Sequence, residues 1–169
     1  MMPKESFMQI LYDIDKASEI FDTVDFEIYF LGGAACVLGE YTDRATRDFD
    51  FIDIGYSSKM GRIFSLFRDF DMLEYESTIL APDYKSRAKK LEGLKNFSAY
   101  VLAPEDIIVS KIIRLGEKDI EDIEILIEQC DKAIINQIIE SVILRDDLFQ
   151  TKKMGFMNNL ENFRERFNV

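Results

Sequence analysis

The sequence predicts an α+β fold, in which a mixed β-sheet is flanked by helices and followed by a helical C-terminal part. Three observations predict this class: an amphipathic helical pattern opens the chain, strand-like and helical runs mix in its middle, and only helical patterns follow Pro104. Hydrophobic residues make up 47% of the 169 residues and charged residues 31%, which is enough apolar material for one core.

The first elements follow from the spacing of their apolar residues. Residues 4–21 carry apolar side chains at helical intervals, which predicts an amphipathic helix. Residues 26–31 form a short aromatic and apolar run, which is typical of a buried strand. This run leads directly into Gly32-Gly33, and we expect a short helix over 34–38 to follow.

The middle of the chain alternates between strand and helix patterns. A polar loop over 40–46 precedes 47–54, whose alternating polar and apolar residues predict a strand. By the same two periodicities we expect a helix over 60–70, a strand over 72–80, a turn with an edge strand over 82–91, and a strand over 97–102.

The last third of the chain is predicted to be helical. Pro104 begins a helix, because proline is favoured in a first turn and the following acids suit the positive end of the helix dipole. Three further helices are expected over 119–129, 132–144 and 154–167. We therefore expect one domain, with an α+β core over 1–103 and a helical part over 104–169 packed on it.

The composition excludes several kinds of chemistry. The chain has no His, so it has no Ser-His-Asp or Cys-His machinery and no His-ligated zinc, iron or copper. A metal would have to be hard and bound by oxygen, such as Mg²⁺ or Mn²⁺. The 21 basic and 32 acidic residues give a net charge of −11, which argues against duplex DNA binding by a broad positive field.

The cysteines and the apolar runs bear on the compartment. Cys36 and Cys130 lie far apart without paired spacing, so they are expected to be buried free thiols in a reducing cytoplasm. The acidic N-terminal segment does not resemble a signal peptide, and no apolar run approaches the roughly 20 residues of a membrane span. We expect a cytoplasmic protein without a membrane partner.

The first candidate site is Asp48-Phe49-Asp50. On a strand, residues i and i+2 face the same side, so both carboxylates would suit a divalent cation that also holds phosphate oxygens. The chain contains eight such acidic pairs, and the alternative for any one of them is a solvated surface. Only this pair follows a strand that ends in Gly32-Gly33, where backbone can approach a ligand closely. The alternative for the two glycines is a tight turn.

These residues resemble a known motif. Gly32-Gly33 followed by Arg44-x-Thr46-x-Asp48-x-Asp50 is similar to the first motif of the DNA polymerase β-like nucleotidyltransferase superfamily. The closer resemblance is to small bacterial nucleotidyltransferase-like proteins related to the AbiEii toxins of type IV toxin–antitoxin systems. The downstream residues of that group resemble Lys111, Arg114, Asp119 and Asp122. The resemblance covers about residues 28–129.

The resemblance implies a role for each matched position. Gly32, Gly33, Arg44 and Thr46 would belong to the nucleotide site, although Arg44 and Thr46 could instead support the strand. Asp48 and Asp50 would be catalytic and would hold Mg²⁺ or Mn²⁺.

The downstream positions have implied roles of their own. Lys111 would be catalytic and pair with phosphate beside Arg114. Asp119 and Asp122 would serve as a base or organise these two cations. The alternatives are a solvated helix face with ion pairs, and Asp119 as the N-cap of the next helix.

Two features leave the chemistry open. Superfamily enzymes usually have a third carboxylate on a later strand, and the candidates Glu74, Glu76 and Glu92 lie in no recognisable motif. A basic stretch runs through Lys85, Arg87, Lys89, Lys90 and Lys95. It could steer an RNA acceptor, but we favour an edge strand that charge protects against pairing.

Three functional interpretations follow. The first is an enzyme that moves a nucleoside monophosphate from an NTP to a hydroxyl of RNA or protein, as a toxin with an antitoxin partner. The second is an inactive nucleotide-binding or protein-interaction module with the same fold. The third is an unrelated acidic domain, which predicts that Asp48 and Asp50 point away from Gly32-Gly33.

Overall fold

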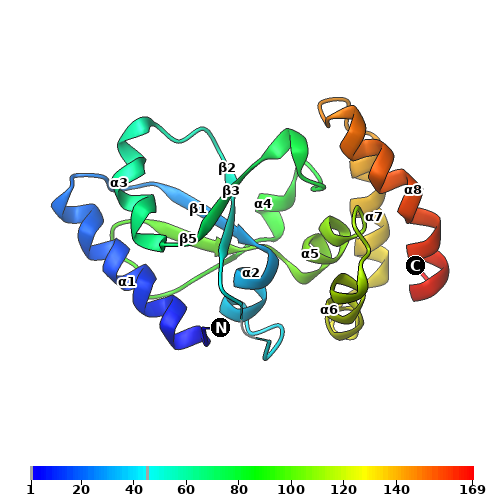
Figure 1. Cartoon of the computed structure of the whole chain (residues 1–169), viewed down its shortest axis with the longest axis horizontal. Helices are drawn as coiled ribbons and strands as arrows, with labels where there is room; N and C mark the ends of the chain where they lie inside the picture. The colour runs from blue at the N-terminus through cyan, green and yellow to red at the C-terminus, as the bar shows by residue number, and fades with distance from the viewer. Residues whose placement is uncertain (1, 45) are drawn as a thin grey trace. The chain divides into compact units, whose positions relative to one another are not determined.

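A computed structural model describes residues 2–44 and 46–169 (Figure 1). Met1 and Ala45, which falls within the predicted loop 40–46, lie outside the described residues. The chain divides into two compact units. The first comprises the residues up to Leu73 together with Ala88–Leu102, and the second comprises Glu74–Arg87 and Ala103–Val169.

The first unit is built on a five-stranded mixed sheet with strand order β3-β2-β1-β5-β4. Central β1 is antiparallel to β2 and parallel to β5, and the short β4 closes one edge. The elements are α1 (Lys4–Ile20), β1 (Glu27–Leu31), α2 (Gly32–Leu38), β2 (Phe49–Asp53), α3 (Gly61–Phe64), β3 (Phe70–Glu74), β4 (Lys89–Lys90) and β5 (Ser98–Val101).

The register of β1 and β2 separates the two faces of this sheet. Phe30 pairs with Phe51 and Leu31 pairs with Asp50, and neighbouring residues on a strand face opposite sides. The Phe30 side belongs to an aromatic core, in which Phe49 contacts Phe7 of α1 at 4.7 Å between ring centroids. The carboxylate of Asp50 therefore lies on the face opposite this core.

The second unit is helical. Its helices are α4 (Tyr84–Arg87), α5 (Pro104–Lys111), α6 (Glu117–Ile127), α7 (Lys132–Ile143) and α8 (Gln150–Phe167). The helix α8 buries Phe156, Leu160 and Phe163 along one stripe, which is the spacing that an amphipathic helix requires. Asp131 caps α7, since its side chain accepts a hydrogen bond from Ala133 N at 2.8 Å.

The α+β class is confirmed, as are the helices predicted near both ends of the chain. Two predictions in the middle are wrong. Residues 60–70 form two 3₁₀ turns around the short α3 and then enter β3 at Phe70, because Arg68 adopts φ +67° and breaks the helical path. The strand expected over 72–80 lies at 70–74 instead.

The residues after β3 are bound by a distant arginine rather than by a neighbouring strand. The guanidinium of Arg145 donates to the backbone carbonyls of Tyr75, Thr78 and Leu80 at 2.8–3.0 Å. These carbonyls would be hydrogen-bonded to another strand if 75–80 continued the sheet.

Candidate functional site

The two glycines after β1 contact the two polar residues of the motif. Gly32 has φ +62°, and a Cβ added to it would meet the carboxylate of Asp50, whose Cγ lies 3.4 Å from that position. A Cβ added to Gly33 would lie 2.6 Å from Oγ1 of Thr46. Glycine is therefore favoured at both positions, at Gly32 by conformation and by space, and at Gly33 by space alone.

Asp50 and Asp48 differ in their surroundings. Asp50 is half-buried on β2, beside Gly32. Asp48 is exposed and lies one residue before β2, which begins at Phe49 rather than at residue 47 as predicted. The contact between Asp50 and Gly32 contradicts, for this carboxylate, the interpretation that the acids point away from the glycines.

The loop before β2 is held at several points. Thr46 accepts a hydrogen bond at its carbonyl oxygen from Met2 N at 2.9 Å, and the two residues form an isolated antiparallel bridge. The hydroxyl of Tyr41 donates to the carbonyl oxygen of Leu102 at 3.1 Å. Arg44 is exposed in this loop. Thr46 therefore contacts Met2 through its backbone and Gly33 through its side chain.

In the second unit, Lys111 joins two helices. Its ammonium Nζ lies 2.9 Å from Oδ2 of Asp122 and 3.4 Å from Oδ1 of Asp119, and only 9% of the side chain is exposed. Arg114 donates to Asp119 Oδ1 at 2.9 Å, whereas 72% of its side chain is exposed. The ion pairs of the alternative interpretation are present: those of Lys111 are largely shielded from solvent, whereas Arg114 stays exposed.

The position of Asp119 explains how α6 begins. Gly116 is the N-cap. Its backbone N–H donates to Oδ2 of Asp119, three residues later in the chain, at 3.3 Å. Asp119 is therefore not the N-cap, which contradicts the alternative interpretation of this residue. One carboxylate both caps α6 and pairs with two cations, so Asp119 organises Lys111 and Arg114.

A metal triad is absent from the described part of the chain. Residues 2–44 and 46–169 contain no group of three or more Asp, Glu or Cys side chains arranged to hold an ion. The three candidates for a third carboxylate, Glu74, Glu76 and Glu92, are all exposed. Two carboxylates still fit Mg²⁺, because this ion commonly takes one or two protein carboxylates and completes its shell with water and substrate phosphates.

The basic stretch has mainly structural roles. Lys89 and Lys90 form the edge strand β4, as the favoured interpretation predicts. Arg87 makes two hydrogen bonds of 2.8 Å to Asp106, which is completely buried, and a third to Asp83. Burial raises the pKa of the Asp106 carboxyl, and the hydrogen bonds from Arg87 lower it in part.

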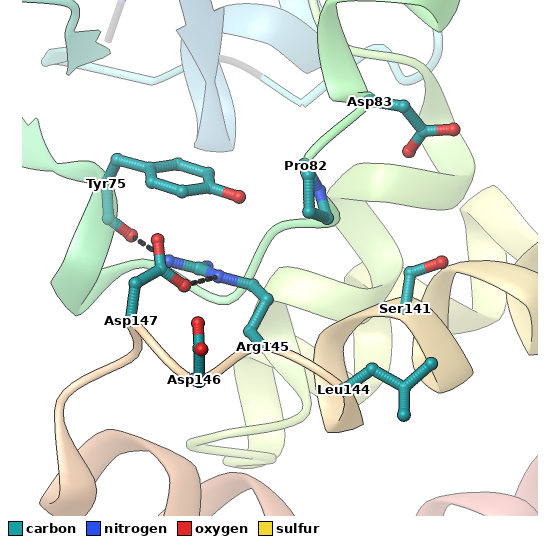
Figure 2. A pocket seen from close by; sticks show the side chains of 8 residues that line it. All are labelled: Tyr75, Pro82, Asp83, Ser141, Leu144, Arg145, Asp146 and Asp147. Carbon is teal, nitrogen blue, oxygen red and sulfur yellow. Dashed lines mark hydrogen bonds and ion pairs between the residues drawn. The ribbon is translucent and has the colours of Figure 1, made fainter.

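Arg145 and Tyr75 form a further polar cluster, which local sequence patterns do not indicate (Figure 2). The guanidinium of Arg145 lies 3.8 Å from the centroid of the Tyr75 ring, and Arg145 is 4% exposed. The two residues border a cavity of about 550 Å³ in the second unit. The negative charge of the acidic residues that line this cavity is neutralised in part, because Asp147 pairs with Arg145 and Asp83 pairs with Arg87.

A family model now adds to this geometry. A model described as a nucleotidyltransferase of unknown function (DUF6036) matches residues 5–168. The chain belongs to this family. The match supports the superfamily that Gly32-Gly33 and the Asp48/Asp50 pair resemble, whereas the kinship with AbiEii toxins stays a prediction. No curated protein and no solved structure matches the chain.

The family match covers both units, so both candidate clusters lie within it. The first unit carries Gly32, Gly33, Thr46 and the acidic pair, and the second carries the Lys111 cluster. Across residues 2–44 and 46–169, no helix has the length and apolar character needed to cross a bilayer.

Proposed function

We propose that this member of the nucleotidyltransferase family transfers a nucleoside monophosphate from an NTP to a hydroxyl group of RNA or protein. The observation that carries the proposal is the contact of Gly32 with the Asp50 carboxylate at the end of β1. Because Gly32 has no side chain, the Asp50 carboxylate lies directly against the backbone at the end of β1, where a cation that it holds could also bind a phosphate group.

Each residue of the first unit has a proposed task. Asp48 and Asp50 hold Mg²⁺ or Mn²⁺, and the triphosphate binds beside the backbone of Gly32 and Gly33. The bound cation would stabilise the charge that develops on the phosphate oxygens during displacement at the α-phosphorus. Thr46 maintains the loop against Gly33, and Arg44, which is exposed in the same loop, belongs to the proposed nucleotide site.

The second unit has a cluster of cations of its own, for which we propose binding of an anion. Arg114 has an exposed guanidinium that can accept an anionic partner beyond Asp119. Lys111 is shielded by two carboxylates, so its proposed contact with phosphate requires an exchange of ion-pair partners. Asp119 and Asp122 act as organisers of these cations rather than as a base.

The proposed setting is a cytoplasmic toxin with an antitoxin partner, related to AbiEii toxins. One observation favours a second candidate, an inactive nucleotide-binding module or protein-interaction module. The described residues contain no third carboxylate beside Asp48 and Asp50, which leaves activation of the acceptor hydroxyl without an assigned base.

The test of the enzyme is transfer of label from NTPs. The wild-type protein is incubated with each α-labelled NTP, Mg²⁺ and total RNA or total protein, beside an Asp48→Asn/Asp50→Asn variant that keeps the shape of both side chains. We expect labelled acceptor with wild type only. Equal labelling by the variant refutes the proposal.

Calorimetry separates the two candidates. Titration of NTP with Mg²⁺ into the protein is expected to give binding that the double Asn variant loses. Binding without labelling of any acceptor supports the inactive nucleotide-binding module. A result with no binding and no labelling excludes nucleotide chemistry for both candidates. It leaves only a protein-interaction role.

A further inference from the structure

The segment before α1 contacts the loop that leads to the acidic pair. The backbone N–H of Met2 donates to the carbonyl oxygen of Thr46 at 2.9 Å. The side chain of the same Thr46 lies against Gly33. A single residue of the loop is therefore held between the N-terminal segment on its backbone side and the glycine pair on its side-chain side.

A second contact holds the beginning of the same loop. Nζ of Lys4 lies 3.0 Å from Oε1 of Glu40, and this pairing lowers the pKa of the Glu40 carboxyl. Glu40, two residues after the end of α2, adopts φ +60°, so the chain changes direction there. Residues 2–4 thus contact the loop at both ends, at Glu40 and at Thr46.

The N-terminal segment is itself firmly attached. Pro3 accepts backbone hydrogen bonds from Ser6 and Phe7 at its carbonyl oxygen, at 3.1 and 3.3 Å. Phe7, Leu11 and Ile14 of α1 are completely buried. Because α1 is fixed by this packing, the two residues before it present the Met2 amide from a rigid base rather than from a free chain end.

We propose that residues 2–4 are a clamp that positions loop 40–46, and through Thr46 the glycine pair, for nucleotide binding. This inference rests on the proposed nucleotide site and adds positioning residues to it. The clamp acts through a backbone amide and one ion pair, and contributes no atom to the substrate. By linkage, a nucleotide that needs the ordered loop also tightens the clamp.

The test uses two substitutions at one position. Met2→Pro removes the N–H that Thr46 accepts, whereas the matched control Met2→Ala keeps it. The dissociation constant for NTP with Mg²⁺ is measured by calorimetry for both variants and for wild type. We expect Met2→Pro to bind about 2- to 10-fold more weakly, which is the range of one hydrogen bond. Met2→Ala is expected to match wild type.

Three further measurements test the interpretation. Hydrogen exchange of the loop amides should be faster in Met2→Pro than in Met2→Ala, and NTP should slow it in wild type. The charge swap Lys4→Glu/Glu40→Lys should recover part of the affinity lost by Lys4→Glu alone. Thermal unfolding of all variants shows whether a loss of affinity comes from general destabilisation.

The outcomes distinguish this inference from the proposed function. Equal affinity of Met2→Pro and Met2→Ala, with wild type binding NTP, overturns the clamp and leaves the nucleotide site intact. Absence of NTP binding by wild type overturns the proposed function, and the clamp with it. Weaker binding by Met2→Pro alone, with faster loop exchange and unchanged thermal unfolding, supports the clamp.

Discussion

Replacing Gly32 by alanine tests the candidate site most directly, because the structure gives a matched control. Gly32 and Gly55 both have positive φ, at +62° and +90°. A Cβ at Gly32 meets the Asp50 carboxylate, whereas a Cβ at Gly55 meets nothing within 4 Å. Both variants carry the strain of a side chain at positive φ, on the order of 1–2 kcal/mol. Only Gly32→Ala also displaces Asp50.

The size of that displacement sets the expected effect on activity. To reach an ordinary contact of about 3.5 Å, the Asp50 carboxylate or the glycine backbone has to move by about 1 Å. A misplacement of about 1 Å at a reacting centre can lower the rate on the order of 100-fold. We therefore expect Gly32→Ala to lose about that factor in kcat/KM, and Gly55→Ala to stay near wild type.

The assay is transfer of label from an α-labelled NTP, with urea unfolding of both variants as the measure of stability. Similar losses of stability with a large difference in activity support the contact between Gly32 and Asp50 as part of the site. If Gly32→Ala transfers label as fast as Gly55→Ala, the space beside Asp50 has no role in the reaction and the reasoning fails.

The remaining predictions concern buried charges and thiols. Lys111→Met leaves two acids without their cation and should lower the free energy of unfolding by about 3–5 kcal/mol in urea titrations, whereas exposed Lys118→Met should change it by less than about 0.5 kcal/mol. Burial raises the pKa of Asp106 in the folded state, so its contribution to stability falls as pH rises through that pKa. Arg87→Met removes the hydrogen bonds that lower this pKa. The free energy of unfolding should therefore fall more at about pH 7 than at about pH 4. Burial raises the thiol pKa of Cys130 to about 12, so iodoacetamide should label it only after unfolding, and rapid labelling of the native protein would contradict this.

Local patterns predict the parts of this fold whose contacts are local. The helix at Lys4–Ile20 and the strand β2 follow from periodicity, and β1 follows from its short aromatic and apolar run. The prediction for the region after β2 is wrong because tertiary contacts override its helical spacing. Phe67 and Phe70 both pack against Phe51, at 5.5 and 5.7 Å between ring centroids, and this packing separates a short helix from a strand.

The candidate site also contains some contacts that sequence spacing indicates and others that it does not. The contacts of Gly32 with Asp50 and of Gly33 with Thr46 agree with a motif read from spacing. The burial of Lys111 depends on how α5 and α6 pack across the turn at 112–116, which spacing does not specify. Arg145 gave no local signal, because its partners Tyr75, Thr78 and Leu80 lie 65 or more positions earlier in the sequence.

The division of the chain between its two units has a consequence for folding. The chain passes from one unit to the other near residues 73, 87 and 102, so neither unit is a continuous stretch of sequence. During synthesis, β1 cannot form its parallel pairing until β5, about 70 residues later, has been made. The carbonyls of Tyr75, Thr78 and Leu80 bind Arg145 only after a further 65–70 residues have been made. Such long-range closure slows folding and leaves β1 with an unpaired edge in nascent chains, where chaperones or a partner chain would meet it first.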